Sequence, residues 1–209
     1  MRVLQRSCIA SSPHSYSHRI LITMPNKGVD IMTTTTTATN AASPNPYGEL
    51  AKTLLEQERL LQVERFDDRD AWALGGTVVN HIFETGIDLG TSIFRPNGTV
   101  MFRYLSKGAG MGNIEWMRRK FNTIAATGHC SLYTWACWQR DGEGGEYADL
   151  AAHNDYAVCG GGFPLMTADG DLLAVLTVSA LPHQKDHAFL TECLAAWKNV
   201  EIPRATIIG

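Results

Sequence analysis

The chain has 209 residues, of which 44% are apolar and 19% are charged, and its formal net charge is −3 at pH 7. A chain of this size and composition suits a single globular domain with a sizeable core. The slightly acidic balance lacks the basic surface expected of a general nucleic-acid-binding protein, and no apolar stretch approaches the roughly 20 residues that span a bilayer. We therefore expect neither nucleic acid nor a membrane as a partner.

The cysteines are odd in number, and no two of them form a CxxC pair: Cys8, Cys130, Cys137, Cys159 and Cys193. This usage is typical of reduced thiols in a cytosolic protein and not of a disulfide framework. A cytoplasmic location is therefore expected.

The N-terminal stretch differs in composition from the rest of the chain. Residues 1–29 contain Arg, Ser and His but neither Asp nor Glu, which is the composition of a mitochondrial transit peptide. A dispensable or over-extended leader, with a later start at Met24 or Met32, is the other interpretation. The polar, Pro-containing tract that follows buries too little apolar surface to fold. We expect a disordered leader over residues 1–46 and one folded domain over residues 47–209.

Two amphipathic helices are expected at the start of the domain. Leucines recur at helical spacing over residues 47–63. A second helix begins near Asp67, whose carboxylate suits a helix N-terminus, and ends at Gly86.

From residue 89 onward, the spacing of apolar residues changes from the helical period to the two-residue period of β-strands. Residues 89–95 and 99–105 are rich in β-forming residues and flank Asn97-Gly98. This dipeptide tolerates the positive φ that a tight turn demands, so the sequence predicts a hairpin.

The middle of the chain returns to helical spacing. Residues 107–112 form a glycine-rich loop, and Asn113 is expected to cap a helix with an apolar stripe that extends to Ile124. Residues 131–140 fit either a helix or a strand, and the helix is favoured. Residues 141–147 form a polar loop.

A second hairpin and a last helix complete the domain. Residues 158–166 and 171–179 are joined through Ala168-Asp169-Gly170, and the second of these runs is dense in β-branched and aliphatic residues; a helix follows Pro182. The order ααββααββα contains hairpins and no repeated strand–helix–strand crossover, which disfavours a doubly wound parallel sheet. The predicted fold class is therefore α+β, with helices packed against an antiparallel sheet.

The tract Gly160-Gly161-Gly162-Phe163-Pro164 is the most unusual stretch of the sequence. Glycines let a ligand approach the backbone closely or let the chain adopt positive φ. A phosphate cradle is disfavoured, because the GxGxxG fingerprint is absent and no helix follows. A bend where a strand begins and a pocket lined by backbone both stay open as interpretations.

His183 and His187 lie four residues apart with Asp186 nearby. On a helix this spacing puts two imidazoles on one face, as in metal chelates. However, Pro182 places His183 at or before the first turn, and no third ligand or HExxH motif is present. Helix initiation is the favoured interpretation, with Asp186 at the positive end of the helix, and no metal site is predicted.

Trp116 is followed by three consecutive cations, Arg118, Arg119 and Lys120. Such a group beside an indole can hold a carboxylate or phosphate of a ligand, whereas a solvated helix face is the commoner arrangement; both interpretations stay open. His129 follows this helix and is expected to be structural, because adjacency to a cysteine in sequence does not make a catalytic dyad.

Three blocks of the sequence resemble a known family. They are GNIEWMRRKFNTIAATGHCSLY, GGGFPLM and LLAVLTVSALPHQKDHAFL. Together they are similar to an uncharacterised cytosolic family classed with haem-degrading domains, the superfamily of HbpS-type, GlcG and PduO C-terminal domain proteins. The resemblance covers roughly residues 50–200.

The resemblance implies a profilin-like, three-layer α/β/α domain with a central antiparallel sheet, and a homo-oligomer. Two positions depart from the family pattern, since Ala180 stands where many relatives have Gly, and Cys130 where Ser is usual. By position in the blocks, the resemblance implies these ligand-binding residues: Asn113, Trp116, Arg119, Lys120, His129, Ser131, Gly161, Phe163, Ser179, Asp186 and His187.

The functional hypothesis is a small-molecule-binding protein for a planar or anionic ligand, with haem as the candidate cofactor. One alternative is an oligomeric protein-interaction module in which Trp116 is an interface anchor. The other is an oxidoreductase acting on haem, with His129, Asp186 and His187 as acid–base groups. No residue is assigned as catalytic, and whether the protein is an enzyme stays open.

Overall fold

The computed structural model describes residues 45–209, so the predicted leader lies outside the described residues except for its last two positions. Helix α1 spans Pro46–Leu60 and is capped by Asn45, whose Oδ1 accepts a hydrogen bond from the Tyr47 amide at 3.0 Å. Helix α2 spans Asp68–Thr85. As predicted, Asp67 caps it, accepting from two backbone amides, and it stops at Gly86, where φ is +68°.

Both predicted hairpins are present. Strands β1 (Gly90–Phe94) and β2 (Val100–Leu105) turn through Gly98 at φ +84°. Strands β3 (Gly162–Met166) and β4 (Leu172–Ser179) form the second pair. The order across the sheet is β2-β1-β4-β3, and every neighbouring pair is antiparallel. The two hairpins therefore join through β1 and β4, the first and the last strand.

The remaining helices are α3 (Met111–Thr127), α4 (Ser131–Asp141), α5 (Ala148–Ala152) and α6 (His183–Lys198), with a 3-10 turn η1 at Gly142–Gly144. The helix expected over residues 131–140 is confirmed, whereas the sequence did not indicate α5 or η1. These two are short and polar, and they carry no apolar stripe that sequence periodicity could reveal.

The predicted start of α3 was wrong. The helix begins at Met111 with Gly110 as its N-cap, so Asn113 is the third helical residue. Its side chain reaches back, and Oδ1 accepts a hydrogen bond from the Gly110 amide at 2.9 Å. The asparagine therefore caps the helix from inside its first turn.

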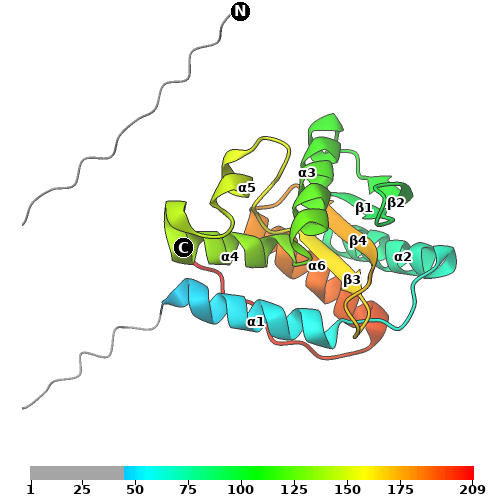
Figure 1. Cartoon of the computed structure of the whole chain (residues 1–209). Coiled ribbons are helices and arrows are strands. Elements are labelled where there is room, and N and C mark those ends of the chain that lie inside the picture. Colours follow the sequence, from blue (N-terminus) through cyan, green and yellow to red (C-terminus); the bar gives the residue numbers. More distant parts are fainter. Residues whose placement is uncertain (1–44) are drawn as a thin grey trace, which may run out of the picture. The chain divides into compact units, whose positions relative to one another are not determined.

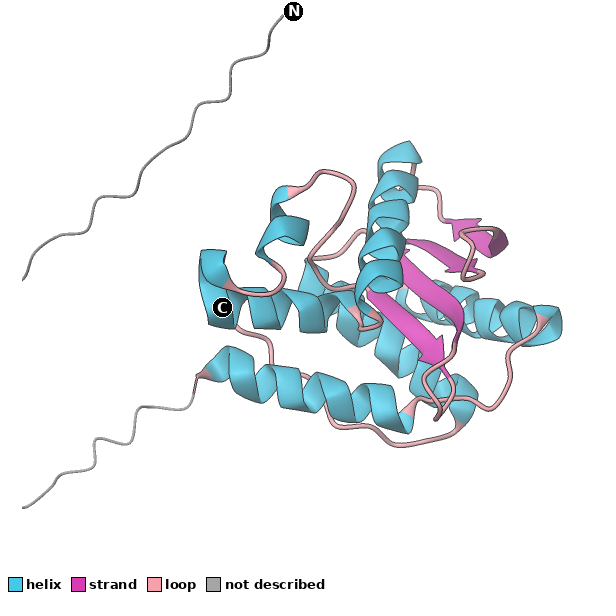
Figure 2. Ribbon diagram, viewed as in Figure 1, coloured by secondary structure: helices cyan, strands magenta, loops and turns pink. Residues whose placement is uncertain are grey.

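Helices cover both faces of the sheet. Figure 1 shows α3 crossing one face, with α6 on the other, where α2 also packs. Helix α1 runs alongside α4. In Figure 2 the strands lie between these helices. The structure thus confirms the predicted α+β class with a central antiparallel sheet.

The alternation of side chains explains why both faces are covered. Ile93, Leu176 and Phe163 pair across β1, β4 and β3 and are fully buried toward α2 and α6. Phe94 and Val175 point the other way and pack against α3. A sheet that is apolar on both faces requires helices on both sides.

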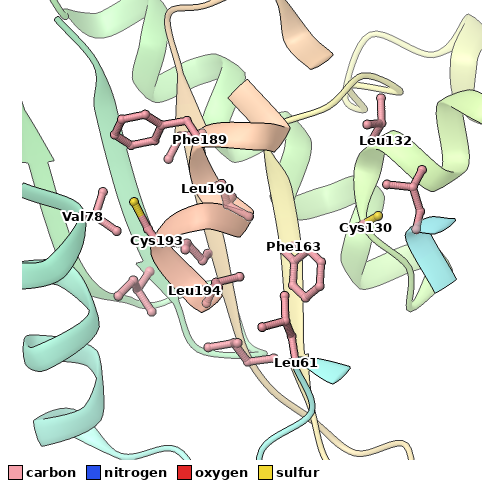
Figure 3. Close-up of a cluster of buried hydrophobic side chains, with 14 of the residues drawn as sticks. Leu61, Val78, Cys130, Leu132, Phe163, Phe189, Leu190, Cys193 and Leu194 are labelled. Atoms are coloured by element: carbon pink, nitrogen blue, oxygen red, sulfur yellow. The ribbon is translucent and has the colours of Figure 1, made fainter. Parts of the chain in front are cut away.

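The larger of two clusters of buried apolar side chains holds α6 against the sheet. Figure 3 shows Phe189, Leu190, Cys193 and Leu194 of α6 among buried side chains from other elements, including Phe163 of β3. Full burial of such side chains stabilises by about 1.5–3 kcal/mol each. This packing sets the position of the N-terminal turn of α6.

No helix within residues 45–209 is long and apolar enough to cross a membrane.

Candidate functional site

A pocket of about 400 Å³ opens where β4 ends and α6 begins. Helix α3 forms the opposite wall. Its lining comes from three stretches far apart in the sequence: Asn113, Trp116 and Lys120; Cys159; and Ser179, Ala180, Leu181, His183 and Asp186.

A buried ion pair forms the base of this pocket. Lys120 Nζ lies 2.8 Å from Asp186 Oδ2, and each side chain is only 3% exposed. The ammonium also donates to the Val178 carbonyl at 2.7 Å. Asp186 Oδ1 accepts from the Leu181 amide at 2.9 Å and the Ala180 amide at 3.3 Å. Burial outweighs these partners and raises the pKa of the Asp186 carboxyl above its ordinary value.

The glycine tract packs directly against this pair. Gly161 has φ +103°, and a Cβ atom added there would lie 2.5 Å from Lys120 Nζ and 2.7 Å from the Asp186 Cβ. Gly160 faces the His183 carbonyl just as closely, and Gly162 faces Ile124.

Two of the tract's three amides already have internal acceptors. The Gly160 amide donates to His183 Nδ1 at 3.2 Å, and the Gly162 amide donates to Ser131 Oγ at 3.0 Å. These contacts favour a close backbone approach at the start of β3 over a backbone-lined pocket.

The two imidazoles of α6 are held in defined tautomers by their hydrogen bonds. Because His183 Nδ1 accepts from Gly160, the neutral ring carries its proton on Nε2. His187 is buried, and its Nε2 lies 2.8 Å from Gln57 Oε1. The amide group of Gln57 donates to the Pro203 carbonyl, so Gln57 Oε1 must accept from the His187 N–H.

Neither of these imidazoles gains a proton at neutral pH. Burial, followed by the charge of Lys120, lowers the pKa of His183. Burial and the same ammonium lower the pKa of His187 to about 3. Both rings beside the ion pair are therefore neutral.

His129 lies outside the pocket between α3 and α6. Its Nδ1 is 2.9 Å from Glu58 Oε2, and Glu58 Oε1 accepts from the Cys130 amide at 2.6 Å. The hydrogen bond with Glu58 raises the pKa of His129. His129 lines a separate pocket near the β3–β4 turn.

The structure brings together only part of the predicted site. Asn113, Trp116, Lys120, Ser179 and Asp186 all line the first pocket. Three of the other predicted residues support this pocket from outside its lining. Arg119 stacks on Trp116 with its guanidinium carbon 4.6 Å from the ring centre, Gly161 packs on the ion pair, and Ser131 accepts a hydrogen bond from the Gly162 amide. Phe163 and His187 are buried, and His129 lines a different pocket.

Sequence reasoning missed four pocket residues: Cys159, Ala180, Leu181 and His183. His183 carried a usable signal, because it precedes Asp186 by three positions, and such residues share a helix face. The other three follow from the close approach of β4 and the glycine tract to α6, which no local pattern encodes.

The family model described as "Haem degrading protein HbpS-like" matches residues 66–195. The chain belongs to the HbpS-like family. A UPF0303 protein of Yersinia enterocolitica is 32% identical over 140 residues, which cover 67% of this chain and 83% of that protein. The family resemblance of the three sequence blocks is confirmed.

Solved structures show a similar fold. The HbpS-like chain is similar to the Ybr137w protein with a TM-score of 0.64 and 27% identity, covering 71% of this chain and 87% of that one. It is also similar to the PduOC:Heme complex with a TM-score of 0.53 and 18% identity, covering 68% and 99%. The second likeness concerns the fold alone.

The buried ion pair predicts a strong effect of removing one partner. Lys120→Met should lower the free energy of unfolding by roughly 3–5 kcal/mol, because it leaves a buried carboxylate without its cation. The double variant K120M/D186L should recover most of that loss, since apolar replacement of a whole buried pair is often neutral. Arg118→Met, which breaks an exposed pair with Glu115, should cost less than about 1 kcal/mol. Urea unfolding measures all three, and a double variant no more stable than K120M would contradict the prediction.

The glycine tract predicts a second difference in stability. Gly161→Ala should destabilise by roughly 3 kcal/mol or more, because it combines a strained φ with overlap against Lys120 and Asp186. Gly170 is the matched control, since it has a similar φ of +92° but open space around it. Gly170→Ala should cost about 1–2 kcal/mol, from backbone strain alone. Equal losses in the two variants, measured by thermal unfolding, would mean that the close packing is unimportant.

Proposed function

We propose that this HbpS-like domain binds a small planar anion in the pocket between α3 and α6. The observation that carries the proposal is the meeting of an indole and an ammonium at one pocket. Trp116 is 46% exposed although it lies beside the buried Lys120. An exposed large aromatic at a pocket is an expected platform for a flat ligand.

The hydrogen-bonding groups of the pocket favour an acceptor-rich ligand. A lysine ammonium has three N–H donors, and within residues 45–209 Lys120 has two acceptors, Val178 and Asp186. One N–H therefore remains for a ligand. The Nε2–H of His183, which lines the same pocket, adds a further donor. The carboxylate of Asp186 is already neutralised by its own partners.

The proposal predicts selective binding of aromatic carboxylates. Benzoate and indole-3-acetate should bind in calorimetry and should shift the indole N–H resonance of Trp116, whereas the neutral amide benzamide should bind at least about tenfold more weakly. Trp116→Ala should weaken binding by about tenfold or more. Trp72→Ala, at an exposed indole outside the pocket, is the matched control and should leave the affinity for these carboxylates unchanged. If no aromatic carboxylate binds at millimolar concentration, or if W116A binds as well as the wild type, the proposal fails.

A tetrapyrrole is the second candidate ligand. The haem-degrading family model and the likeness to a heme complex both support it. The pocket between α3 and α6 fits its carboxylates better than its iron, however. His183 offers an N–H there and not a lone pair, and burial raises the pKa of the Cys159 thiol, which disfavours a thiolate ligand.

A homo-oligomer is supported by a separate surface. Trp72 and Phe83 on α2 are 75% and 64% exposed. Each stacks edge-on against a side chain of β2, Trp72 on Phe102 and Phe83 on Tyr104. Strand β2 is an edge of the sheet, and exposed apolar surface beside a free strand edge is typical of subunit contacts. We propose that a second copy of the chain covers this face.

The assembly prediction separates this face from the pocket. The double variant W72E/F83E should lower the mass measured by light scattering, because it places charges in an apolar contact. Leu55→Glu, at an exposed leucine of α1, and Trp116→Ala are controls that should keep the wild-type mass. A mass unchanged in W72E/F83E would rule out this face, and a loss of mass in W116A would make Trp116 an interface anchor instead.

A further inference from the structure

An extended segment, residues 201–209, follows α6 and belongs to no helix or strand. The C-cap of α6 is Asn199, whose left-handed φ of +55° lets the chain reverse its direction. In Figure 1 the segment is red and runs back along α1. It then contacts Gln184 in the first turn of α6. We call residues 201–209 the strap, because they connect the end of α6 with its beginning.

The strap turns every third side chain toward the domain. Ile202, Ala205 and Ile208 are half-buried and pack against the larger core cluster, whereas the residues between them are exposed. This period matches the polyproline II conformation, which has three residues per turn. The strap therefore presents one apolar side to the helices beneath it.

Glutamine side chains hold the backbone of the strap. A polyproline II segment has no internal hydrogen bonds, and within residues 45–209 the strap backbone makes three hydrogen bonds, all with glutamines. Gln184 makes two of them, because its Nε2 donates to the Ile208 carbonyl and its Oε1 accepts from the Ile208 amide, both at 2.8 Å. Gln184 lies between His183 and Asp186, which line the pocket. The strap thus restrains the helical turn that carries both pocket residues.

The third hydrogen bond connects the strap to a buried imidazole. Gln57 is 1% exposed, and its Nε2 donates to the Pro203 carbonyl at 2.7 Å. Its Oε1 accepts from His187 Nε2 at 2.8 Å. The other ring nitrogen of His187 is buried and has no hydrogen-bond partner within residues 45–209. The orientation of the His187 ring therefore depends on Gln57, and that of the Gln57 amide depends on the strap.

The strap is not packed tightly along its whole length. A groove of about 610 Å³ lies between it and Ala188, Thr191 and Ala195 of α6. Segments with few buried apolar contacts open locally at a lower free energy than the whole domain unfolds. The strap can therefore leave its place while the sheet and its helices stay folded.

We propose that the strap regulates ligand binding in the pocket between α3 and α6. When docked, it fixes the first turn of α6 and with it the directions of His183 and Asp186. When released, this turn loses the restraint, and the pocket binds its ligand less tightly. Because the two equilibria are linked, a ligand in the pocket strengthens the docking of the strap by the same factor. The regulation rests on the proposed binding of a planar anion, whereas the docking of the strap is testable without a ligand.

Benzoate titrations of the full chain test the linkage with a matched pair of variants. Ile208→Asp puts a charge on the side that faces the core and should release the strap, so that benzoate binds about fivefold more weakly or worse. Ile207→Asp makes the same change at the adjacent residue, which is 57% exposed, and should stay within about twofold of the wild type. Gln184→Met removes two hydrogen bonds from the helix side without changing a residue that lines the pocket, and it should weaken binding as Ile208→Asp does.

Hydrogen exchange at the Ile208 amide gives the reciprocal measurement. In the wild type, saturating benzoate should slow this exchange by the factor by which Ile208→Asp weakens benzoate binding, because both experiments report the same coupling. If I208D and Q184M both bind benzoate as tightly as the wild type although the amide at position 208 has lost its protection, the proposal is overturned. An equal loss of affinity in I207D overturns it as well.

A measurement without ligand separates the strap from the anion pocket. If no aromatic carboxylate binds to the wild type, the proposed function fails, and the imidazole resonances of His183 then decide the role of the strap. They should shift in Ile208→Asp and in Ile202→Asp, which is a second substitution on the core-facing side, and they should keep their wild-type positions in Ile207→Asp. Resonances that stay unchanged in all three variants would show that the strap does not position the first turn of α6.

Discussion

The buried ion pair between Lys120 and Asp186 determines how the surrounding backbone and side chains can pack. Removing two charges from water costs several kcal/mol per ion, which their mutual attraction repays only with good geometry and additional hydrogen bonds. The chain supplies these bonds from the Val178 carbonyl and from the amides of Ala180 and Leu181. The pair thereby fastens α3 to the end of β4 and to the first turn of α6. These are the three elements that form most of the pocket between α3 and α6.

The same pair explains the residues around it. The backbone passes so close to Lys120 Nζ and the Asp186 Cβ that only glycine fits at position 161. The ammonium, together with burial, keeps His183 and His187 uncharged. The pocket therefore combines a neutralised carboxylate with several hydrogen-bond donors. General acid–base chemistry needs a group whose pKa lies near the working pH, and the lowered pKa values of His183 and His187 therefore disfavour these two rings in that role.

The sequence predicted the elements whose signals are local. The turn at Gly98 and the caps of α2 depend on a few adjacent residues, and both are present. The start of α3 was misplaced because an asparagine can cap a helix from its third position as well as from its first. The meeting of Trp116, Lys120 and Asp186 was predicted from the family blocks, because no local pattern links residues so far apart in the chain.

The contact between His129 and Glu58 lay beyond sequence reasoning for the same reason. Its partner Glu58 is 71 positions earlier in the chain, on a helix that showed only an apolar stripe. The adjacent residue of α1, Gln57, holds His187 behind the ion pair. Neighbouring residues of a helix point about 100° apart, so two adjacent positions of α1 hold two different imidazoles. A displacement of α1 would therefore release both rings at once, because each ring has its side-chain hydrogen bond to this helix.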